Sequence, residues 1–330
     1  MSPLTFAQYR HGVLVHLLAD RAPPDAHSDH FRVWSLGTGA GDDPDDIVVV
    51  HDFLPEEIDN NIGGYVADEL MPLLARLPRR PAVNGYAYSE QEIFERYVGA
   101  IVRSIDGNER RAWHRFYDNT LTALRQPTPP CPGNGVANFN ASARALYAQV
   151  LGLAGEAAAE SLLDVATCFG FLPLHLATGG AAGRLRRIVG CDLNAALVAL
   201  AEDYRRMRDI PAVSFVRADI LAADVHRDLP TDGGSFDVVT AIHLLEHLMV
   251  AECAAAVANL WALTGRRLII AVPFEAVADP RFGHQQVFDE PRLKALGRSV
   301  GGYCRYFEHH GGWLIVDRVA GNEPRQEEQE

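Results

Sequence analysis

The chain has 330 residues, which is enough for one large domain or two ordinary ones, and 48% of them are hydrophobic. Its formal net charge is −13, and this acidic balance repels phosphate backbones, so we expect no nucleic-acid partner. No run approaches the roughly eighteen apolar residues of a transmembrane helix, so no membrane span is expected.

The five cysteines include no Cys-x-x-Cys pair, a pattern typical of reduced thiols in a cytosolic protein. Residues 1–10 lack the basic and apolar regions of a signal peptide. We therefore expect a cytoplasmic protein. The polar and acidic residues 321–330 predict a disordered tail.

The first part of the chain, residues 1–130, is predicted to be a mostly helical accessory region that determines substrate specificity. One or two strands are expected within residues 31–51, where residues 47–51 form a buried apolar run. Helices are predicted from apolar spacing over residues 64–77, 90–104 and 108–124. Residues 127–135 are rich in proline and glycine and predict a linker, and residues 131–320 form the second domain.

The second part alternates short apolar runs with helical patterns, which indicates βαβ units and a parallel sheet. The predicted strands are residues 161–165, 185–191, 213–217, 236–242 and 267–272. The predicted helices are residues 142–153, 170–178, 195–206 and 251–264. A last pair of runs, 302–308 and 313–318, predicts an antiparallel hairpin at the sheet edge. The fold class is therefore α/β, with a Rossmann-like sheet.

Acidic residues follow the predicted strands at the edge where open parallel sheets bind ligands. The first strand runs through Asp164 into a turn of small residues and then a helix, so the backbone can approach a ligand closely. Asp192 ends the next strand, where a carboxylate can accept both hydroxyls of a ribose. Asp219 closes the third strand, where a carboxylate can accept the exocyclic amine of adenine. For either Asp192 or Asp219 alone, a helix cap after a strand is the competing interpretation.

This ordered set of motifs resembles the class I S-adenosylmethionine-dependent methyltransferases over nearly all of the second half of the chain. The resemblance implies a seven-stranded Rossmann-like sheet, S-adenosylmethionine as cofactor, and methyl transfer as the activity. It also implies that Asp164 positions the methionine part of the cofactor. The other cofactor-binding residues that it implies are Ala166, Cys168 and Gly170 in the loop, Asp192 and Leu193 at the ribose, and Asp219 and Ile220 at the adenine. The usual D-x-G-x-G-x-G is present as D-V-A-T-C-F-G; the loop can still form because the two substitutes are small, and a weakened site is the alternative.

A histidine-rich motif follows the fourth strand. On a helix, His243, Glu246 and His247 would share one face, and His284 follows the fifth strand at the same edge. The set is similar to the E-x-x-E-H and distant histidine of the small-RNA terminal 2′-O-methyltransferases, which hold a divalent metal near the acceptor hydroxyl. This resemblance implies a metal bound by all four residues, and the histidine in place of the first glutamate favours Zn, Mn, Fe or Co over Mg. A bound cation would lower the pKa of the acceptor hydroxyl and orient vicinal hydroxyls.

Two other interpretations of this motif stay open. Leu-Glu-His after the fourth strand is common in this family without a metal, and Glu246 and His247 then cap or pack the helix. In that case His243 or His247 is the catalytic residue, acting as general base. The same residues match the H-x-x-E-H of inverted zinc proteases, but the strand motifs around them argue against that class.

The whole chain is similar to the actinobacterial mycofactocin oligosaccharide methyltransferases in its length and in residues 51–65 and 272–288. This resemblance implies methylation of a glucose hydroxyl on a glycosylated redox cofactor. We therefore expect an O-methyltransferase acting on a small-molecule or oligosaccharide substrate, with a sugar hydroxyl as the favoured acceptor. Two alternatives are a C- or N-methyltransferase of natural-product metabolism without a metal, and a non-catalytic adenosyl-binding module that regulates a partner.

Overall fold

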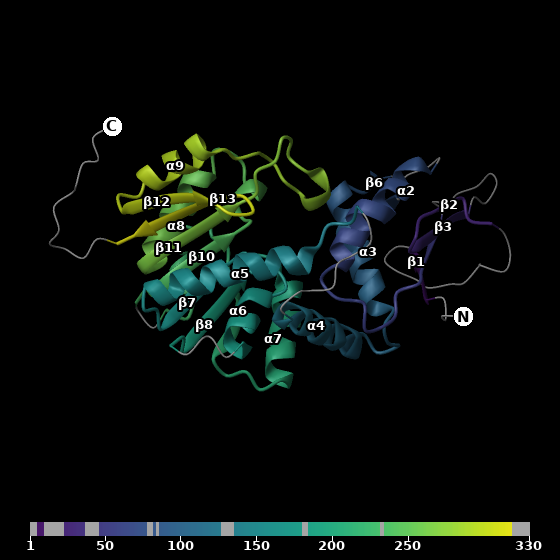
Figure 1. The fold of residues 1–330 in the computed structure, drawn as a ribbon, viewed down its shortest axis with the longest axis horizontal. Helices are drawn as coiled ribbons and strands as arrows, with labels where there is room; N and C mark the ends of the chain where they lie inside the picture. Colours follow the sequence, from purple (N-terminus) through teal and green to yellow (C-terminus); the bar gives the residue numbers. More distant parts are fainter. Residues whose placement is uncertain are drawn as a thin grey trace. The chain divides into compact units, whose positions relative to one another are not determined.

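The computed structural model describes residues 5–9, 23–36, 46–77, 82–83, 86–126, 135–179, 184–231 and 234–318. The chain divides into an N-terminal unit, Met1–Arg144 with Asp279–Gly283, and a C-terminal unit, Ala145–Ala278 with His284–Glu330. Figure 1 shows the fold, coloured along the sequence. The predicted tail lies outside the described residues, as does the predicted linker apart from residue 135. The division at residue 130 into a specificity region and a catalytic domain stays a prediction.

The C-terminal unit is built on a seven-stranded sheet in the order β12-β13-β11-β10-β7-β8-β9 (Figure 1). Its strands are β7 (Ser161–Val165), β8 (Arg187–Asp192), β9 (Val213–Arg217), β10 (Phe236–Ile242), β11 (Thr264–Val272), β12 (Tyr303–Glu308) and β13 (Gly312–Asp317). Strands β7 to β11 pair in parallel, whereas β13 pairs antiparallel with both β11 and β12. The predicted fold class, including the terminal antiparallel hairpin, is confirmed.

Helices precede and connect the strands of this sheet. They are α5 (Phe139–Glu156), which crosses the division between the units, α6 (Phe171–Thr178), α7 (Ala195–Met207), α8 (Cys253–Leu263), α9 (Glu290–Arg298) and the short 3-10 helices η2 (Val225–Arg227) and η3 (Leu245–His247). Helix α9 was not predicted, although its start is visible in the sequence: Asp289 caps it by accepting from the Arg292 N–H, and a proline follows in the first turn. Within the described part of the chain, no helix is both long enough and apolar enough to cross a membrane.

The strand order determines where a ligand can bind. The chain steps outward from β7 to β8 and β9, and then returns to the other side of β7 with β10 and β11. The order therefore reverses between β7 and β10, and ligands of open α/β sheets bind at the carboxyl ends of the strands at such a point. The sheet itself is covered on both faces: Leu162 and Leu163, whose side chains point to opposite faces, are both fully buried.

The N-terminal unit combines a small sheet with helices. Its antiparallel sheet has the order β1-β4-β3-β2, and the helices follow it in the chain. The elements are β1 (Thr5–Tyr9), β2 (Ala26–His27), β3 (Phe31–Leu36), β4 (Asp46–His51), α1 (Ile62–Tyr65), the π-helix η1 (Val66–Leu70), α2 (Met71–Arg76), β5 (Ala82–Val83), β6 (Tyr86–Ala87), α3 (Glu90–Arg103), α4 (Glu109–Arg125) and the 3-10 helix η4 (Pro280–Phe282). The three predicted helical stretches and the two strands within residues 31–51 are confirmed. Strands β1 and β2 were not predicted, because the short runs that form them carry no sustained alternation of apolar and polar residues.

Candidate active site

The turn after β7 forms a tight loop in which three residues have left-handed backbones. The φ angles are 58° at Ala166, 52° at Cys168 and 72° at Gly170, the three positions where the usual motif has glycine. A residue with a Cβ atom in this conformation costs about 1–2 kcal/mol relative to the right-handed one. The loop therefore forms as predicted without two of its glycines, and it holds Ala166 and Cys168 in strained conformations.

Hydrogen bonds from the neighbouring strand hold this loop in place. The Thr167 N–H donates to the Cys191 carbonyl at 3.0 Å, and the Cys168 N–H donates to the Asp192 carboxylate at 2.9 Å. The Gly170 N–H donates to the Thr167 carbonyl at 2.8 Å, which closes the turn before α6. The two bonds to Cys191 and Asp192, at the end of β8, explain how the strained loop is stabilised.

Asp192 lies at the end of β8, beside the loop. Its second oxygen accepts from the Asn194 N–H at 2.8 Å. Helix α7 is capped by Asn194, whose side chain accepts from the Ala196 N–H at 3.0 Å, so Asp192 is not the helix cap that we considered. Each carboxylate oxygen has a second lone pair, so Asp192 can still accept ribose hydroxyls. Leu193 beside it is 59% exposed, which leaves an apolar surface at the proposed ribose position.

Asp219 and Ile220 follow β9 at the same edge of the sheet, because Asp192 pairs in register with Arg217 on a parallel strand. One Asp219 oxygen accepts from the Leu221 N–H at 2.9 Å and so stabilises the turn. The buried Ile220 is held by its backbone, since Nδ2 of Asn259 on α8 donates to the Ile220 carbonyl at 2.7 Å. The two strand-end aspartates therefore lie at one edge of the sheet, as the cofactor prediction requires. We call this edge, with the loop of residues 166–170, the cofactor rim.

Asp164 lies inside this rim and is almost completely buried. Thr167 and Thr240 donate their hydroxyls to it at 2.6 and 2.7 Å. Burial raises the pKa of Asp164 to about 6, although the two hydroxyl donors lower it. This carboxyl therefore ties the cofactor loop to the adjacent strand β10, and its predicted contact with the methionine part of the cofactor stays a prediction.

The residues after β10 differ from the predicted helix. His243 has a left-handed φ of 56° and donates its N–H to the Ala271 carbonyl, and the three-residue 3-10 helix η3 then follows. The expectation that His243, Glu246 and His247 share the face of an α-helix was wrong, because an isolated 3-10 turn does not repeat the i, i+3, i+4 spacing. His243 Nδ1 lies 3.8 Å from Glu246 Oε1 but outside the group that could hold an ion.

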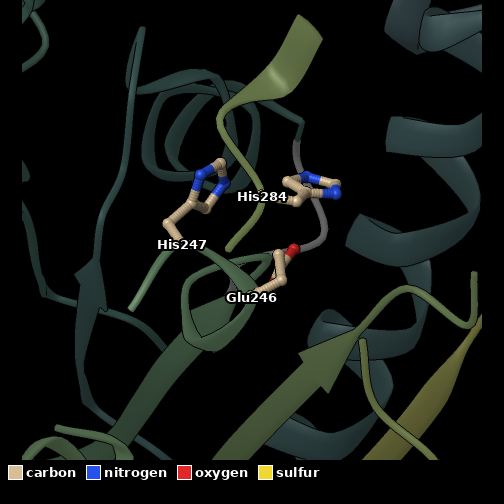
Figure 2. Close-up of side chains that lie close together, drawn as sticks. All are labelled: Glu246, His247 and His284. Carbon is tan, nitrogen blue, oxygen red and sulfur yellow. The ribbon is translucent and has the colours of Figure 1, made fainter. Parts of the chain in front are cut away.

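Three of the four predicted metal ligands do come together. One potential ligand atom each from Glu246, His247 and His284 lies within 4.8 Å of the other two, and Figure 2 shows the side chains close together. The Glu246 side chain is 1% exposed, and no other described residue donates a hydrogen bond to either of its oxygens. Burial raises the pKa of this carboxyl to about 8; the backbone N–H of Glu246 itself opposes the shift, and the nearby Glu275 adds to it.

The two histidines of this group are oriented differently. His284 is 7% exposed, and its Nδ1 lies 2.7 Å from an oxygen of Glu275. An ionised carboxylate only accepts, so this bond places a proton on Nδ1, the arrangement in which carboxylates orient metal-binding histidines. His247 is exposed and meets the His284 ring edge-on, with 4.9 Å between the ring centroids. Glu275 was missed from the sequence because it shares no local motif with His284.

His243 remains beside this group. Its side chain is 40% exposed, but its Nε2 is buried and has no hydrogen-bond partner among the described residues. Burial lowers the pKa of His243 to about 4, and the neighbouring His284 and His247 lower it further. The imidazole is therefore neutral near pH 7 and can accept a proton.

Comparison with known proteins identifies a methyltransferase domain in the C-terminal unit. Residues 162–265, from β7 into β11, match the family model described as a methyltransferase domain. This segment contains the strained loop, both strand-end aspartates and the Glu246–His247 pair. A comparison with curated protein sequences finds no match.

Several solved structures are similar to the chain. An O-methyltransferase family protein from Burkholderia thailandensis has 18% identity and a TM-score of 0.46 over 66% of this chain, which spans 62% of that protein's length. The methyltransferase domain of the bacterial protein CtHen1-C has 15% identity and a TM-score of 0.44, covering 53% of this chain and 98% of that one. Magnesium protoporphyrin IX methyltransferase (ChlM) from Synechocystis PCC 6803, solved with bound SAH, has 16% identity and a TM-score of 0.42 over 64% of this chain and 98% of that one.

Proposed function

We propose that this chain, which carries a class I S-adenosylmethionine-dependent methyltransferase domain, transfers the cofactor's methyl group to a hydroxyl oxygen. We further propose that a divalent metal held by Glu246, His247 and His284 assists the transfer. The observation that carries the metal proposal is the buried Glu246 carboxylate, which has two imidazoles beside it and no hydrogen-bond donor among the other described residues. A buried carboxylate is costly unless a donor or a cation compensates it.

The donor set fits a transition metal better than magnesium. Two imidazoles and one carboxylate suit Zn, Mn, Fe or Co, whereas Mg²⁺ prefers an octahedron of oxygens. Three protein ligands leave coordination positions for acceptor oxygens. Glu275 would complete the site by orienting His284. When bound, such a cation supplies a positive charge that lowers the pKa of an acceptor hydroxyl and holds vicinal hydroxyls.

The cofactor would be held by the residues of the rim. We assign the ribose hydroxyls to Asp192 with Leu193, and the adenine to Asp219 with Ile220. Backbone groups of the loop at Ala166, Cys168 and Gly170 would approach the methionine part, supported by Asp164, as the family resemblance implies. The methyl carbon would then face the end of β10, where the acceptor oxygen attacks in line with the breaking bond to sulfur.

His243 is our candidate for the proton acceptor. It lies beside Glu246 without joining the ligand group, so it can remain free when His247 binds a cation. In the transfer, the acceptor oxygen would form a bond to the methyl carbon, the carbon–sulfur bond would break, and the hydroxyl proton would pass to His243. In a metal-free enzyme, His247 would be the second candidate for this role.

The favoured acceptor is a sugar hydroxyl, with the glucose units of the mycofactocin oligosaccharide as the specific candidate. This part of the proposal rests on the resemblance over residues 51–65 and 272–288, and on the ability of vicinal sugar hydroxyls to chelate a cation. The N-terminal unit would supply acceptor specificity. The cytoplasmic location expected from the sequence belongs to the same proposal.

The test combines metal analysis with methyl transfer. Purified protein is analysed for bound metal and then assayed on candidate oligosaccharides with and without a chelator, with S-adenosylhomocysteine as the measured product. We expect chelation to abolish turnover, readdition of Zn, Mn, Fe or Co to restore it, and S-adenosylmethionine affinity to stay unchanged. Full turnover after complete metal removal would overturn the metal proposal and favour a metal-free O-methyltransferase with His243 or His247 as the base, whereas turnover only on acceptors that offer carbon or nitrogen would favour the C- or N-methyltransferase. Cofactor binding without turnover on any acceptor would favour a regulatory module.

A further inference from the structure

The loop that carries His284 is attached to the turn that carries Glu246 and His247 by two neighbouring glutamines. The Gln285 backbone N–H donates to the Glu246 carbonyl at 2.7 Å. The Gln286 side chain is buried, and its Nε2 donates to the Leu245 carbonyl at 2.9 Å and to the Leu248 carbonyl at 2.6 Å. The same nitrogen lies 3.0 Å from Sγ of Cys253. One amide group thus contacts both ends of the three-residue turn.

The turn needs these donors because it is too short to satisfy its own carbonyls. Within it, the His247 N–H donates to the Leu244 carbonyl and the Leu248 N–H donates to the Leu245 carbonyl. Carbonyls at the end of a helix need donors from outside it, and a buried carbonyl without one is costly. Gln286, two residues after His284, donates to the Leu248 carbonyl, which accepts no bond within the turn, and gives the Leu245 carbonyl a second donor.

The other end of the Gln286 side chain is also held. Its Oε1 accepts a hydrogen bond from Nη2 of Arg292, at the start of α9. Nη1 of Arg292 donates to the Val287 carbonyl at 2.8 Å, and its guanidinium lies 4.6 Å from the centre of the Phe288 ring. The amide therefore connects a helix start to the metal-site turn, and its orientation is determined at both ends.

We propose that Gln286 is a positioning residue that holds His284 against Glu246 and His247, so that the three ligand atoms lie close enough to share one ion. This inference rests on the proposed metal function. An amide is required at position 286 because one end must donate to two carbonyls while the other accepts from a guanidinium. A carboxylate there would keep the contact with Arg292 and lose both donors.

The test uses Gln286→Glu in the full chain, with Co²⁺ as the probe. We expect the variant to bind Co²⁺ about tenfold to 100-fold more weakly, as when other outer-shell partners of metal ligands are removed. Its S-adenosylmethionine affinity should stay within about twofold, because Gln286 contacts no residue of the cofactor rim. Asn259→Asp is the reciprocal control: it replaces a similar amide that supports Ile220, so it should weaken cofactor binding and leave Co²⁺ affinity unchanged.

A second readout does not require a metal. His284 is 7% exposed, so its modification by diethyl pyrocarbonate, followed by peptide mass spectrometry, reports whether the loop stays attached. We expect modification to be about tenfold faster in Gln286→Glu, the shift produced by losing one buried hydrogen bond. If Gln286→Glu does not fold, Arg292→Gln releases the other end of the amide and should change both readouts in the same direction.

The outcomes separate the two proposals. Unchanged Co²⁺ affinity and unchanged His284 modification in a folded variant would overturn the positioning role. If the unmodified chain takes up no Co²⁺, the metal function fails, and His284 modification alone then decides the role of Gln286. A lower melting temperature with both readouts at the starting values would show that Gln286 only stabilises the fold.

Discussion

The strained cofactor loop offers two substitutions with opposite expected signs. Cys168 has a left-handed φ of 52°, and its side chain is exposed, so Cys168→Gly removes strain and little packing. The strain costs about 1–2 kcal/mol, and glycine loses about 0.5–1 kcal/mol more backbone entropy on folding. The expected net effect is an increase of about 0.5–1 kcal/mol in the free energy of unfolding.

Gly170→Ala should act in the opposite direction. The φ of Gly170 is 72°, and a Cβ atom there would lie 2.4 Å from Cε1 of Phe215 and 3.2 Å from Cβ of Ala201. Overpacking of this kind costs about 1–3 kcal/mol, and the left-handed backbone adds about 1–2 kcal/mol. We therefore expect a loss of about 2–4 kcal/mol in the free energy of unfolding.

Scanning calorimetry of the full chain measures both effects, since 1 kcal/mol shifts the melting temperature by about 2–4 °C for a domain of roughly 150–250 residues. Cys304→Gly is the matched control, because Cys304 is also exposed but lies in strand β12 with an ordinary φ. It should lower the melting temperature. If Cys168→Gly lowers it by as much as Cys304→Gly, the loop is not strained at residue 168 and the reasoning is refuted.

Three further predictions follow from the site. Asp192→Ala should weaken S-adenosylmethionine binding by roughly 100-fold, since hydrogen bonds to a charged acceptor contribute about 1.5–3 kcal/mol. Titration calorimetry measures this affinity, and a folded variant with unchanged affinity would contradict the ribose assignment. With a chelator present, the free energy of unfolding should fall by about 2 kcal/mol from pH 6.5 to pH 8, because the Glu246 pKa is raised to about 8 and a raised pKa contributes stability that is lost as the pH rises through it. The buried His51 and the half-buried His243 have pKa values lowered to about 4, so they titrate below this window when folded; near pH 6.5 they titrate only when unfolded, which slightly raises stability with pH. Chemical denaturation at both pH values should therefore show no such fall in Glu246→Gln; an equal fall there would assign it to another group. Alkylation of the native protein should modify the exposed Cys168 before the buried Cys191, as peptide mass spectrometry can check. The modification should block cofactor binding, and bound cofactor should slow it. Alkylated protein that still binds the cofactor normally would place Cys168 outside the site.

The sheet and the positions of the acidic residues at its edge could be predicted from the sequence. The predicted bounds of β7, β9 and β10 agree with the structure, because buried parallel strands are short, nearly continuous apolar runs between polar turns. The small residues after β7 and the aspartates after β8 and β9 could be placed on one edge once the strands were known to be parallel. Even so, the sequence did not show that Asn194, and not Asp192, caps α7.

The candidate metal group could be predicted from the sequence only in part. The spacing of His243, Glu246 and His247 predicted one helix face, but the left-handed backbone at His243 and the 3-10 turn after it leave that histidine beside Glu246 and outside the group that could hold an ion. Local spacing cannot reveal such a change of backbone, because the hydrogen bond from the His243 N–H goes to Ala271 on a different strand.

The sequence by itself determined the order of strands and helices and the chemistry available at their ends, since periodicity and turn residues act over a few neighbouring positions. Only the tertiary structure decided which of those groups meet. Glu275 and Gln286 support His284 and its partners through contacts that depend on how separate loops fold together, and no local pattern encodes such contacts.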